Sequence, residues 1–491
     1  MPPAVVAAPS TLAAEVGAEI SSSGGSVVDS VIASALMAMC TEPGVCAPGG
    51  GGFITVWAPD QEPVSIDGYM AMPGRAIDPD RRVVTRRVSM EYGGGVTTEV
   101  GPGTVAVPGA FAAFDLAHRQ WGRMPWDRLL GHVADRLAAG FPLSRACSHY
   151  LSHSATPIFG EDPASRSALF AGDRALTSGD TVTMPDLVQS IRRIAEDGAA
   201  TFYRGDLAAE MVSDLANRGG RLTIDDLAEY RAIVRPGLVS TLGVWTVATT
   251  PPPAIGGVTL TAMLRLVLGH PEPRNPDVWA EAQRQVFELR SLRLEPSPDR
   301  VRAGEELLRE ITALASGSTI SVSGAGADGT VCSASMSAGY GSGVIPRGTG
   351  LWMNNSLGEM ELNPGGLAST PIGARLMSNM APTAADGPGG RLAMGSPGAD
   401  RITSALAITL ALVFTGTGIA QAIEHPRLHV ETAAGTVATE PGLRAALPGF
   451  SLRPYDQLDM YFGGVTAAFV HGESLGAHAD SRRSGAVATV P

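Results

Sequence analysis

The sequence predicts a layered sandwich of the α/β or α+β class, and two observations lead to this prediction. Stretches with strand character occur in both halves of the chain, at residues 53–57, 64–67, 319–323 and 330–337. Segments with helical periodicity lie between and after them. Helices and sheets distributed in this way are expected to pack as layers around a common core.

The first half begins with two predicted helices in residues 14–39, separated by Gly24 and Gly25. The glycines at 49–52 then precede the strand at 53–57, and a proline-bounded turn leads to the strand at 64–67. Residues 70–110 are rich in glycine and proline and are expected to form an ordered loop. Further helices are predicted at 110–119, 126–139, 185–195, 207–218, from 222 onward, and at 257–268.

The second half is expected to start with surface helix and loop at 271–305, followed by a β-hairpin. Alternation at 319–323 places Ile320 and Val322 on one face and the hydroxyl-bearing residues on the other. Asp328-Gly329 supplies the turn to the return strand at 330–337. Short strands are predicted at 351–353 and 392–394, and a buried helix at 402–414 that starts near Ala399.

Composition excludes several classes of function. The 491 residues carry 36 Lys and Arg against 48 Asp and Glu, a net charge of −12, so no basic face for nucleic acid is expected. All basic residues are arginine, which excludes a Schiff-base lysine and a P-loop lysine. The chain begins without a basic segment followed by an apolar one, so we expect a cytoplasmic protein. The most apolar stretch, 405–414, is too short to span a membrane.

The remaining single features are ambiguous when taken alone. The four cysteines form no close pair and are expected to be buried thiols. The glycines at 49–52 precede a strand, so close approach of two backbones is favoured over a phosphate loop. His425 and His429 are separated by Pro426, which disfavours a metal site on one helix face. The amides of Gly398 and Ala399 are expected to be free at a helix N-terminus, where they could stabilise an oxyanion.

A series of motifs in a fixed order indicates a family. These motifs lie at residues 25–32, 48–53, 105–109, 202–205, 222–230, 251–257, 340–343, 354–355, 380–383 and 395–402. Over about residues 11 to 435 the chain resembles the γ-glutamyltranspeptidase family of N-terminal nucleophile hydrolases. The resemblance implies an α+β fold, a four-layer αββα sandwich. It also implies two segments, 1–318 and 319–491, that associate after self-cleavage as one intertwined domain.

The resemblance also implies the position of the nucleophile. In the family it is the first residue of a strand before an Asp-Gly turn, and a gapless count back from Asp328 gives Thr319. An alternative register that aligns Ser321 gives Gly317, which has no side chain. We favour Thr319, with cleavage between Ser318 and Thr319. The new α-amine, with a pKa of about 7.7–8.0, would act as the base for the Thr319 hydroxyl, so no cofactor and no metal are expected.

Some of the residues implied to bind substrate depart from the family pattern, whereas others, such as Ser378, match it. They are Tyr69, Ser337, Asn355, Glu359, Ser378 and Asn379. Tyr69 replaces the arginine that holds the glutamate α-carboxylate, or is only an aromatic wall of the pocket. Glu359 takes the place of the aspartate that binds the α-amino group, or is solvated. Asn379 replaces a serine beside Ser378, Ile320 replaces a threonine, and the segment at 364–375 is short.

These departures lead to three hypotheses about function. The first is hydrolysis of a C–C bond next to a carbonyl of a small metabolite, as in homologues from alkylproline natural-product biosynthesis. The second is an ordinary γ-glutamyl hydrolase or transferase that acts on glutathione-like amides. The third is a non-catalytic binding protein on the same fold, which the Gly317 register would favour. The expected partners are a small-molecule substrate and the two cleaved segments themselves, without nucleic acid or membrane.

Overall fold

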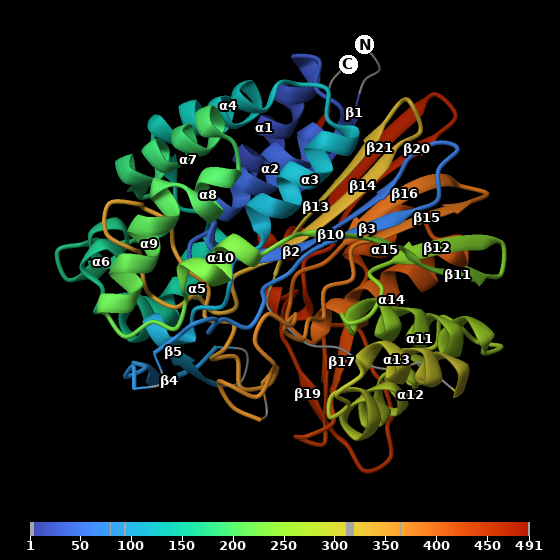
Figure 1. The fold of residues 1–491 in the computed structure, drawn as a ribbon. Coiled ribbons are helices and arrows are strands. Elements are labelled where there is room, and N and C mark those ends of the chain that lie inside the picture. Colours follow the sequence, from blue (N-terminus) through green and yellow to red (C-terminus); the bar gives the residue numbers. More distant parts are fainter. Residues whose placement is uncertain (1–3, 79, 93–94, 311–318, 364, 490–491) are drawn as a thin grey trace.

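Two β-sheets packed face to face form the centre of the protein, and helices cover both outer faces (Figure 1). The structure is a computed structural model, and it describes residues 4–78, 80–92, 95–310, 319–363 and 365–489. The predicted α+β sandwich of four αββα layers is confirmed. No helix in these ranges is long and apolar enough to cross a bilayer.

The first sheet has seven strands. In order from edge to edge they are β10 (Ile233–Pro236), β3 (Val64–Gly68), β2 (Gly51–Trp57), β14 (Val331–Ser337), β13 (Ile320–Gly326), β1 (Ala4–Ala8) and β22 (Ala486–Thr489). All neighbours in this sheet are antiparallel. Strands from either side of position 319 therefore lie next to one another.

The second sheet has six strands, and it too combines distant parts of the chain. They are β11 (Leu238–Leu242), β12 (Trp245–Thr249), β15 (Thr383–Gly387), β16 (Gly390–Gly395), β20 (Thr466–His471) and β21 (Ser474–Ala479). Smaller sheets lie at the periphery. They are β4 (Arg86–Met90) with β5 (Val96–Val100), β6 (Phe141–Pro142) with β9 (Thr181–Val182), β7 (Phe170–Ala171) with β8 (Arg174–Ala175), and β17 (Leu428–Glu431), β18 (Thr436–Thr439) and β19 (Ser451–Pro454).

The helices divide into two layers by position in the sequence. On the side of the first sheet are α1 (Thr11–Ser22), α2 (Val27–Thr41), α3 (Ala110–Trp121), α4 (Trp126–Ala138), α5 (Arg145–Ser154), α6 (Pro163–Leu169), α7 (Pro185–Asp197), α8 (Ala200–Arg204), α9 (Asp206–Asn217) and α10 (Ile224–Glu229). On the side of the second sheet are α11 (Gly256–Gly269), α12 (Pro276–Leu289), α13 (Arg300–Glu310), α14 (Arg401–Phe414) and α15 (Ile419–Glu424). Short helical turns are η1 (Pro102–Thr104), η2 (Ala155–Phe159), η3 (Arg290–Leu294), η4 (Met460–Phe462) and η5 (Ser481–Arg483).

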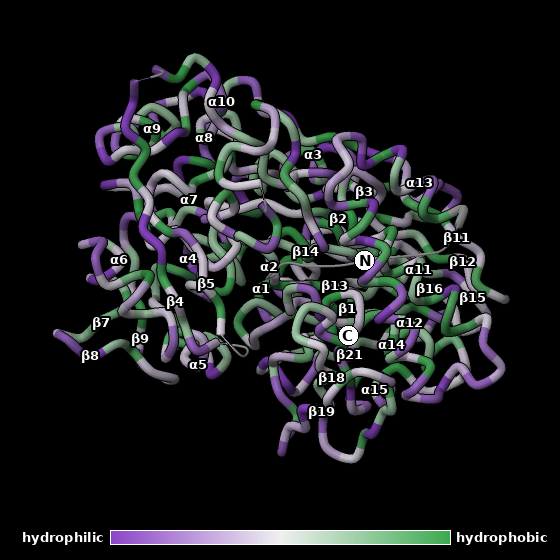
Figure 2. The backbone as a smooth tube through the Cα atoms, turned by 90° about the horizontal axis from the view of Figure 1, so that it is seen from below, coloured by the Kyte–Doolittle hydropathy of each residue, from purple (hydrophilic) through white to green (hydrophobic). Residues whose placement is uncertain are grey.

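The alternation of β13 sorts its side chains between two interfaces, as the sequence predicts. Ile320 and Val322 belong to the core against the helices, whereas Ser323 contacts Thr466 of the second sheet at 3.2 Å. Helix α2 is buried along its whole length because it lies between the first sheet and the outer helices. Its capping box at Ser26 and Asp29 fixes where it begins. Figure 2 shows the hydrophobic residues following such central elements, with hydrophilic residues on the peripheral β7–β8 hairpin.

Several local expectations are wrong or incomplete. The predicted strand at 351–353 does not form, and Met353 makes only an isolated bridge to Gly49. The loop predicted at 70–110 contains the β4–β5 hairpin. The sequence did not indicate these two strands because neither holds a continuous apolar run. Between the helices expected at 126–139 and 185–195, where the sequence predicts no element, the structure has α5 and α6. The four cysteines are buried and unpaired, as expected.

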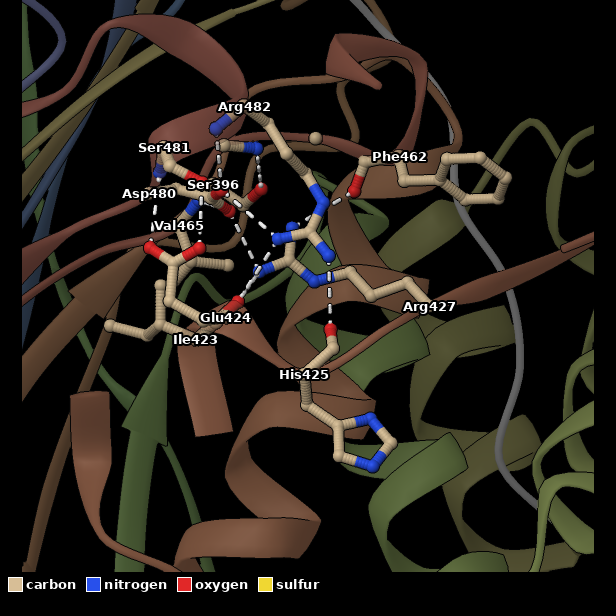
Figure 3. A network of polar contacts seen from close by, with 12 residues as sticks. Ser396, Ile423, Glu424, His425, Arg427, Phe462, Val465, Asp480, Ser481 and Arg482 are labelled. Carbon is tan, nitrogen blue, oxygen red and sulfur yellow. Dashed lines mark hydrogen bonds and ion pairs between the residues drawn. The ribbon is translucent and has the colours of Figure 1, made fainter. Parts of the chain in front are cut away.

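A cluster of four buried charged side chains connects the segments around β17–β18, η4 and η5 near the C-terminus (Figure 3). Asp480 accepts from Arg427 at 2.7 Å and from Arg482 at 3.0 Å, and Arg482 also pairs with Glu440 at 2.5 Å. All four side chains are at most 1% exposed. Arg427 donates in addition to the carbonyl of Phe462 at 3.1 Å. The cluster therefore ties β17–β18 and η5 to η4.

Removing one charge of this cluster is expected to destabilise the protein strongly. Asp480→Asn leaves two buried guanidinium groups with one carboxylate, and the free energy of unfolding should fall by about 3–5 kcal/mol. Urea unfolding measures the change. Asp386→Asn is the control, because Asp386 forms a partly exposed pair with Arg391 at 3.2 Å, worth about 0–1 kcal/mol. Equal effects of both substitutions would contradict this account.

Candidate active site

Four strand ends of the first sheet meet at one place. The antiparallel register pairs Gly52 with Gly68, Gly51 with Ser337, and Met336 with Ile320. Continuing this register places Thr319, just before β13, opposite Ser337, the last residue of β14. Tyr69, which follows β3, lies at the same end of the sheet.

The glycines at 49–52 allow these backbones to approach one another. A Cβ on Gly50 would lie 2.0 Å from the carbonyl oxygen of Ser337, and one on Gly52 would lie 2.0 Å from that of Ser335. Neither distance is compatible with a side chain. The interpretation of this run as a close approach of backbones is therefore correct.

Thr319 carries a buried hydroxyl with an unused hydrogen-bonding capacity. The residue is 1% exposed, and its Oγ1 has no partner within the described residues. Leaving a buried polar group without a partner costs about 1–3 kcal/mol, so such a group marks a candidate for function. Ser318 and Gly317, on the other side of the expected cleavage point, lie outside the described residues.

The end of β16 comes close to the start of β13. A Cβ on Gly395 would lie 2.1 Å from Oγ of Ser321, so little separates the two sheets here. The next helix, α14, begins at Arg401 and not near Ala399 as expected. The difference arises because Gly398 and Ala399 have positive φ angles, +125° and +60°, which no α-helix contains.

The amides of Gly398 and Ala399 are available as donors. Neither N–H has an acceptor in the part of the chain that the structure describes, whereas the carbonyl of Gly398 accepts from Arg401 N–H at 2.9 Å. The two donors precede the N-terminus of α14, where the helix dipole favours negative charge. A Cβ on Gly398 would lie 2.9 Å from the Cα of Gly463, so η4 and the residues after it form the back of this turn. The arrangement can stabilise an oxyanion.

Tyr69 belongs to an apolar cluster. Its ring stacks on Phe53 at 5.5 Å, and the cluster also contains Leu357, Leu376 and Met380. Burial, and then the nearby Glu359 carboxylate, raise the pKa of the Tyr69 hydroxyl well above its usual value. The phenol is therefore neutral and cannot replace the charge of an arginine. This supports its interpretation as an aromatic wall.

A charged clamp that the sequence did not reveal holds the backbone of Tyr69. Its N–H donates to Asp67 Oδ1 at 3.1 Å, and its carbonyl accepts from the Tyr230 hydroxyl at 2.7 Å. Arg375 and Arg235 pair with Asp67 at 2.9 Å each. Arg375 is therefore already paired with a carboxylate of the chain itself. No local motif connects these residues, because they are distant in sequence.

Glu359 is buried and not solvated, which corrects that alternative. Both of its oxygens lack a hydrogen-bond partner among the described residues, and Oε1 would lie 2.8 Å from a Cβ on Gly339. Burial raises the pKa of this carboxyl well above its usual value, and the charge of Glu361 adds to the shift. Because this buried carboxyl holds its proton, a ligand group that brings a positive charge would favour its ionised form.

The other predicted binding residues differ in how far they are satisfied. Asn355 donates to Thr98 and to the carbonyl of Glu99 and accepts from Tyr340 N–H at 2.8 Å, so its role in the structure is to hold the loops. Ser337 accepts from Gly339 N–H at 2.9 Å. Ser378 accepts weakly from Met380 N–H at 3.4 Å. Asn379 resembles Glu359, because both polar atoms of its buried amide are without a partner in the described ranges.

A pocket of about 470 Å³ adjoins the turn at Ala399. Its lining includes Tyr340, Glu361, Asp400 and Arg401, and Glu361 accepts from the Tyr340 hydroxyl at 2.6 Å. The sequence did not predict this pocket, because β4–β5, η3, α14 and β17 each contribute to it. No group of three or more His, Cys, Asp and Glu side chains in the described ranges is placed to hold a metal ion.

Comparisons with known proteins agree with this geometry. The sequence pattern of the gamma-glutamyltranspeptidase family matches residues 13–311 and 276–490. The chain is 25% identical to the glutathione hydrolase proenzyme of Escherichia coli (strain K12), over 89% of this chain and 83% of that protein. Its fold is similar to those of cephalosporin acylase from Bacillus halodurans (TM-score 0.80, 20% identity, 99% and 96% of the two chains) and LmbA2991HD (TM-score 0.74, 18% identity, 99% and 98%). The relatives of this chain are N-terminal nucleophile hydrolases, and the chain belongs to the gamma-glutamyltranspeptidase family.

Proposed function

We propose that the chain cleaves itself between Ser318 and Thr319 and then uses Thr319 to hydrolyse a bond next to a carbonyl of a small metabolite. The observation that carries this proposal is the buried Thr319 hydroxyl without a partner, just before β13 and close to the end of β16, after which the free amides of Gly398 and Ala399 follow. The segments 1–318 and 319–491 would remain one body, because their strands alternate in the first sheet.

The chemistry needs only groups that the chain supplies. The α-amine of Thr319, with an ordinary pKa of about 7.7–8.0, takes the proton of the hydroxyl as its oxygen attacks the carbonyl carbon. The amides of Gly398 and Ala399 hold the oxyanion. When the tetrahedral intermediate collapses, the leaving group takes the electron pair and receives that proton. Water then hydrolyses the ester on Thr319, and the acid is released.

We infer that the acyl portion is not γ-glutamyl. A buried Tyr69 in an apolar cluster offers no positive charge to an α-carboxylate, and Arg375 is already paired with Asp67. Glu359 and Asn379 offer a carboxylate and an amide without partners, which suit an amine and a neutral hydrogen-bonding group. We propose a C–C bond of an alkylproline precursor as the bond cleaved, and the carbon leaving group would be protonated as described above.

The nucleophile is tested by intact mass and N-terminal sequencing. The purified protein should consist of two fragments, the second beginning at Thr319, and Thr319→Ala should remain one chain. Thr319→Ser should still cleave, because it keeps the hydroxyl. A single chain in the unmodified protein would contradict the proposal and favour a non-catalytic binding protein.

Acyl specificity is tested with three p-nitroanilides that differ in one group each. The 4-aminobutyryl compound has only the amine, the γ-glutamyl compound adds the α-carboxylate, and the butyryl compound has neither. We expect kcat/KM for the 4-aminobutyryl compound to exceed that for the γ-glutamyl compound by roughly 10- to 100-fold, because the carboxylate would lack a charged partner worth about 1.5–3 kcal/mol. Fastest release from the γ-glutamyl compound would establish an ordinary γ-glutamyl hydrolase or transferase.

The kind of bond is decided by a second set of substrates. A 1,3-dicarbonyl compound with the same 4-aminobutyryl group is followed by loss of its enol absorbance. Faster turnover of the dicarbonyl than of the anilide supports C–C hydrolysis. Turnover of the anilide alone would contradict it and indicate amide hydrolysis, with the nucleophile unchanged.

The unpartnered carboxylate predicts an unusual dependence of stability on pH. The folded protein holds a proton on Glu359 more tightly than the unfolded chain does. This residue therefore destabilises the fold increasingly as the pH rises above 4.5, the ordinary pKa of a glutamate carboxyl. Glu359→Gln should therefore raise Tm at pH 8, with the difference disappearing near pH 4. Glu305→Gln, an exposed substitution, is the control. A lower Tm for Glu359→Gln at pH 8 would contradict the account.

A further inference from the structure

A chain of polar side chains, buried except for its last member, ends at the turn that carries the free amides. It runs from Gln283 on α12 through Ser404 on α14 to His429 on β17 and then to Asp400, the residue after Ala399. Ser404 Oγ lies 3.1 Å from Gln283 Oε1 and 3.0 Å from His429 Nδ1. His429 Nε2 lies 3.4 Å from Asp400 Oδ2, an ion-pair distance. His429 is 1% exposed, between the rings of Phe287 and Tyr461.

The hydrogen bonds of Gln283 determine where the protons of this chain lie. Its Oε1 accepts from Val430 N–H at 3.0 Å and its Nε2 donates to the carbonyl of Leu428 at 3.4 Å, which fixes the orientation of the amide. Because an amide oxygen only accepts, the hydroxyl proton of Ser404 points to Gln283. Ser404 Oγ is then an acceptor toward His429, so Nδ1 carries a proton.

The second ring nitrogen faces a carboxylate. With Nδ1 protonated, a neutral imidazole would turn the lone pair of Nε2 toward the negative Oδ2 of Asp400, and the two would repel each other. An imidazolium removes this repulsion and forms an ion pair. Although burial alone would raise the pKa of Asp400, Arg401 and then His429 hold it well below its usual value, so the carboxylate is charged.

Asp400 connects this pair to the amides. Its Oδ1 accepts from Arg401 at 2.5 Å, and Arg401 in turn donates to the carbonyl of Tyr461 at 3.1 Å. Both carboxylate oxygens are thereby held, at the N-cap position of α14. The preceding residue, Ala399, has the left-handed conformation that L-residues adopt at a cost and that persists only where neighbours enforce it.

We propose that His429, as an imidazolium, is a positioning residue that holds Asp400 and through it the oxyanion-binding amides of Gly398 and Ala399. This inference rests on the proposed function of that turn. The charged and titratable groups around the pair are Arg290 on η3 with its partner Glu295, Arg401 on α14, Glu431 on β17, Tyr461 on η4 and Glu361, whose carboxyl interacts with Asp400. Arg290 pairs with Glu295, and Arg401 pairs with Oδ1 of Asp400, so His429 is the side chain that faces the other carboxylate oxygen, Oδ2.

The protonation state is tested without any substrate. In ¹⁵N-histidine spectra of the full-length Thr319→Ala protein at pH 7, His429 should show both ring nitrogens protonated, and it should become neutral in Asp400→Asn. His429→Gln assigns the signal. A neutral His429 beside an intact Asp400 would overturn the proposal, whatever the protein's activity.

The effect on the reaction is tested with p-nitrophenyl acetate, an activated ester that needs no recognition of its acyl group. We expect His429→Gln and Asp400→Asn each to lower the saturating acylation rate about 10- to 100-fold with KM changed less than twofold. The double variant should be no slower than the slower single variant, because both substitutions break the same pair. Should His429→Gln fail to fold, the Asp400→Asn variant, altered at a partly exposed residue, still shows whether breaking the pair lowers the acylation rate.

A matched control separates this effect from a general loss of structure. His478→Gln removes another histidine–carboxylate pair, with Glu424 at 3.1 Å, that does not contact the turn, and it should leave the acylation rate unchanged. Independent, multiplicative losses in the double variant, or unchanged rates in both single variants, would overturn the proposal. If the unmodified protein releases no more p-nitrophenol than Thr319→Ala, the proposed function itself fails, and the spectra still decide whether the ion pair exists.

Discussion

The geometry of the site depends on the net-neutral cluster of Arg427, Glu440, Asp480 and Arg482. This cluster fixes η4, and Gly463, the residue after η4, contacts the turn at Gly398. Burying two acids and two bases is expensive, and apolar residues of the same volume could often give equal stability. What charged groups add is direction, because each hydrogen bond has one acceptable geometry. The cluster thus acts as a rigid base for a turn in which small displacements matter.

The polar groups of the site follow the opposite rule. Most buried polar side chains of the described ranges have partners, but those of Thr319, Glu359 and Asn379 have none, and neither do several buried hydroxyls elsewhere, among them Ser30, Ser65 and Thr409. What sets the first three apart is that they stand at positions proposed to react with or bind a substrate, where a ligand would satisfy them. Their separation also has meaning, since the hydroxyl lies at the start of β13, the carboxylate over Gly339, and the amide before β15. In the proposed function these three groups would contact the substrate.

The sequence was sufficient to predict the fold, whereas the residues it suggests for the site stay predictions, and it failed where contacts between distant parts of the chain decide the structure. Alternation in β13 and the apolar periodicity of α14 are local signals, and both elements formed as predicted. The start of α14 was misplaced by two residues because the left-handed turn at Ala399 has no signature when the residue is not glycine. The clamp on Tyr69 and the chain from Gln283 to Asp400 join residues that are far apart in sequence, so no motif could reveal them. The burial of Glu359 could not be predicted from its neighbours in the sequence for the same reason, because residues distant in the chain cover it.

The interleaving of the first sheet has a consequence for how the protein can be made. Strands β13 and β14 lie between β2 and β1, so neither segment alone contains a sheet with its neighbours in place. Each half produced separately would expose long, unpaired strand edges of the kind that template aggregation. Assembly from two independently translated polypeptides should therefore be inefficient. Synthesis as one polypeptide avoids this exposure, because the covalent link keeps the two halves together until every strand edge is covered.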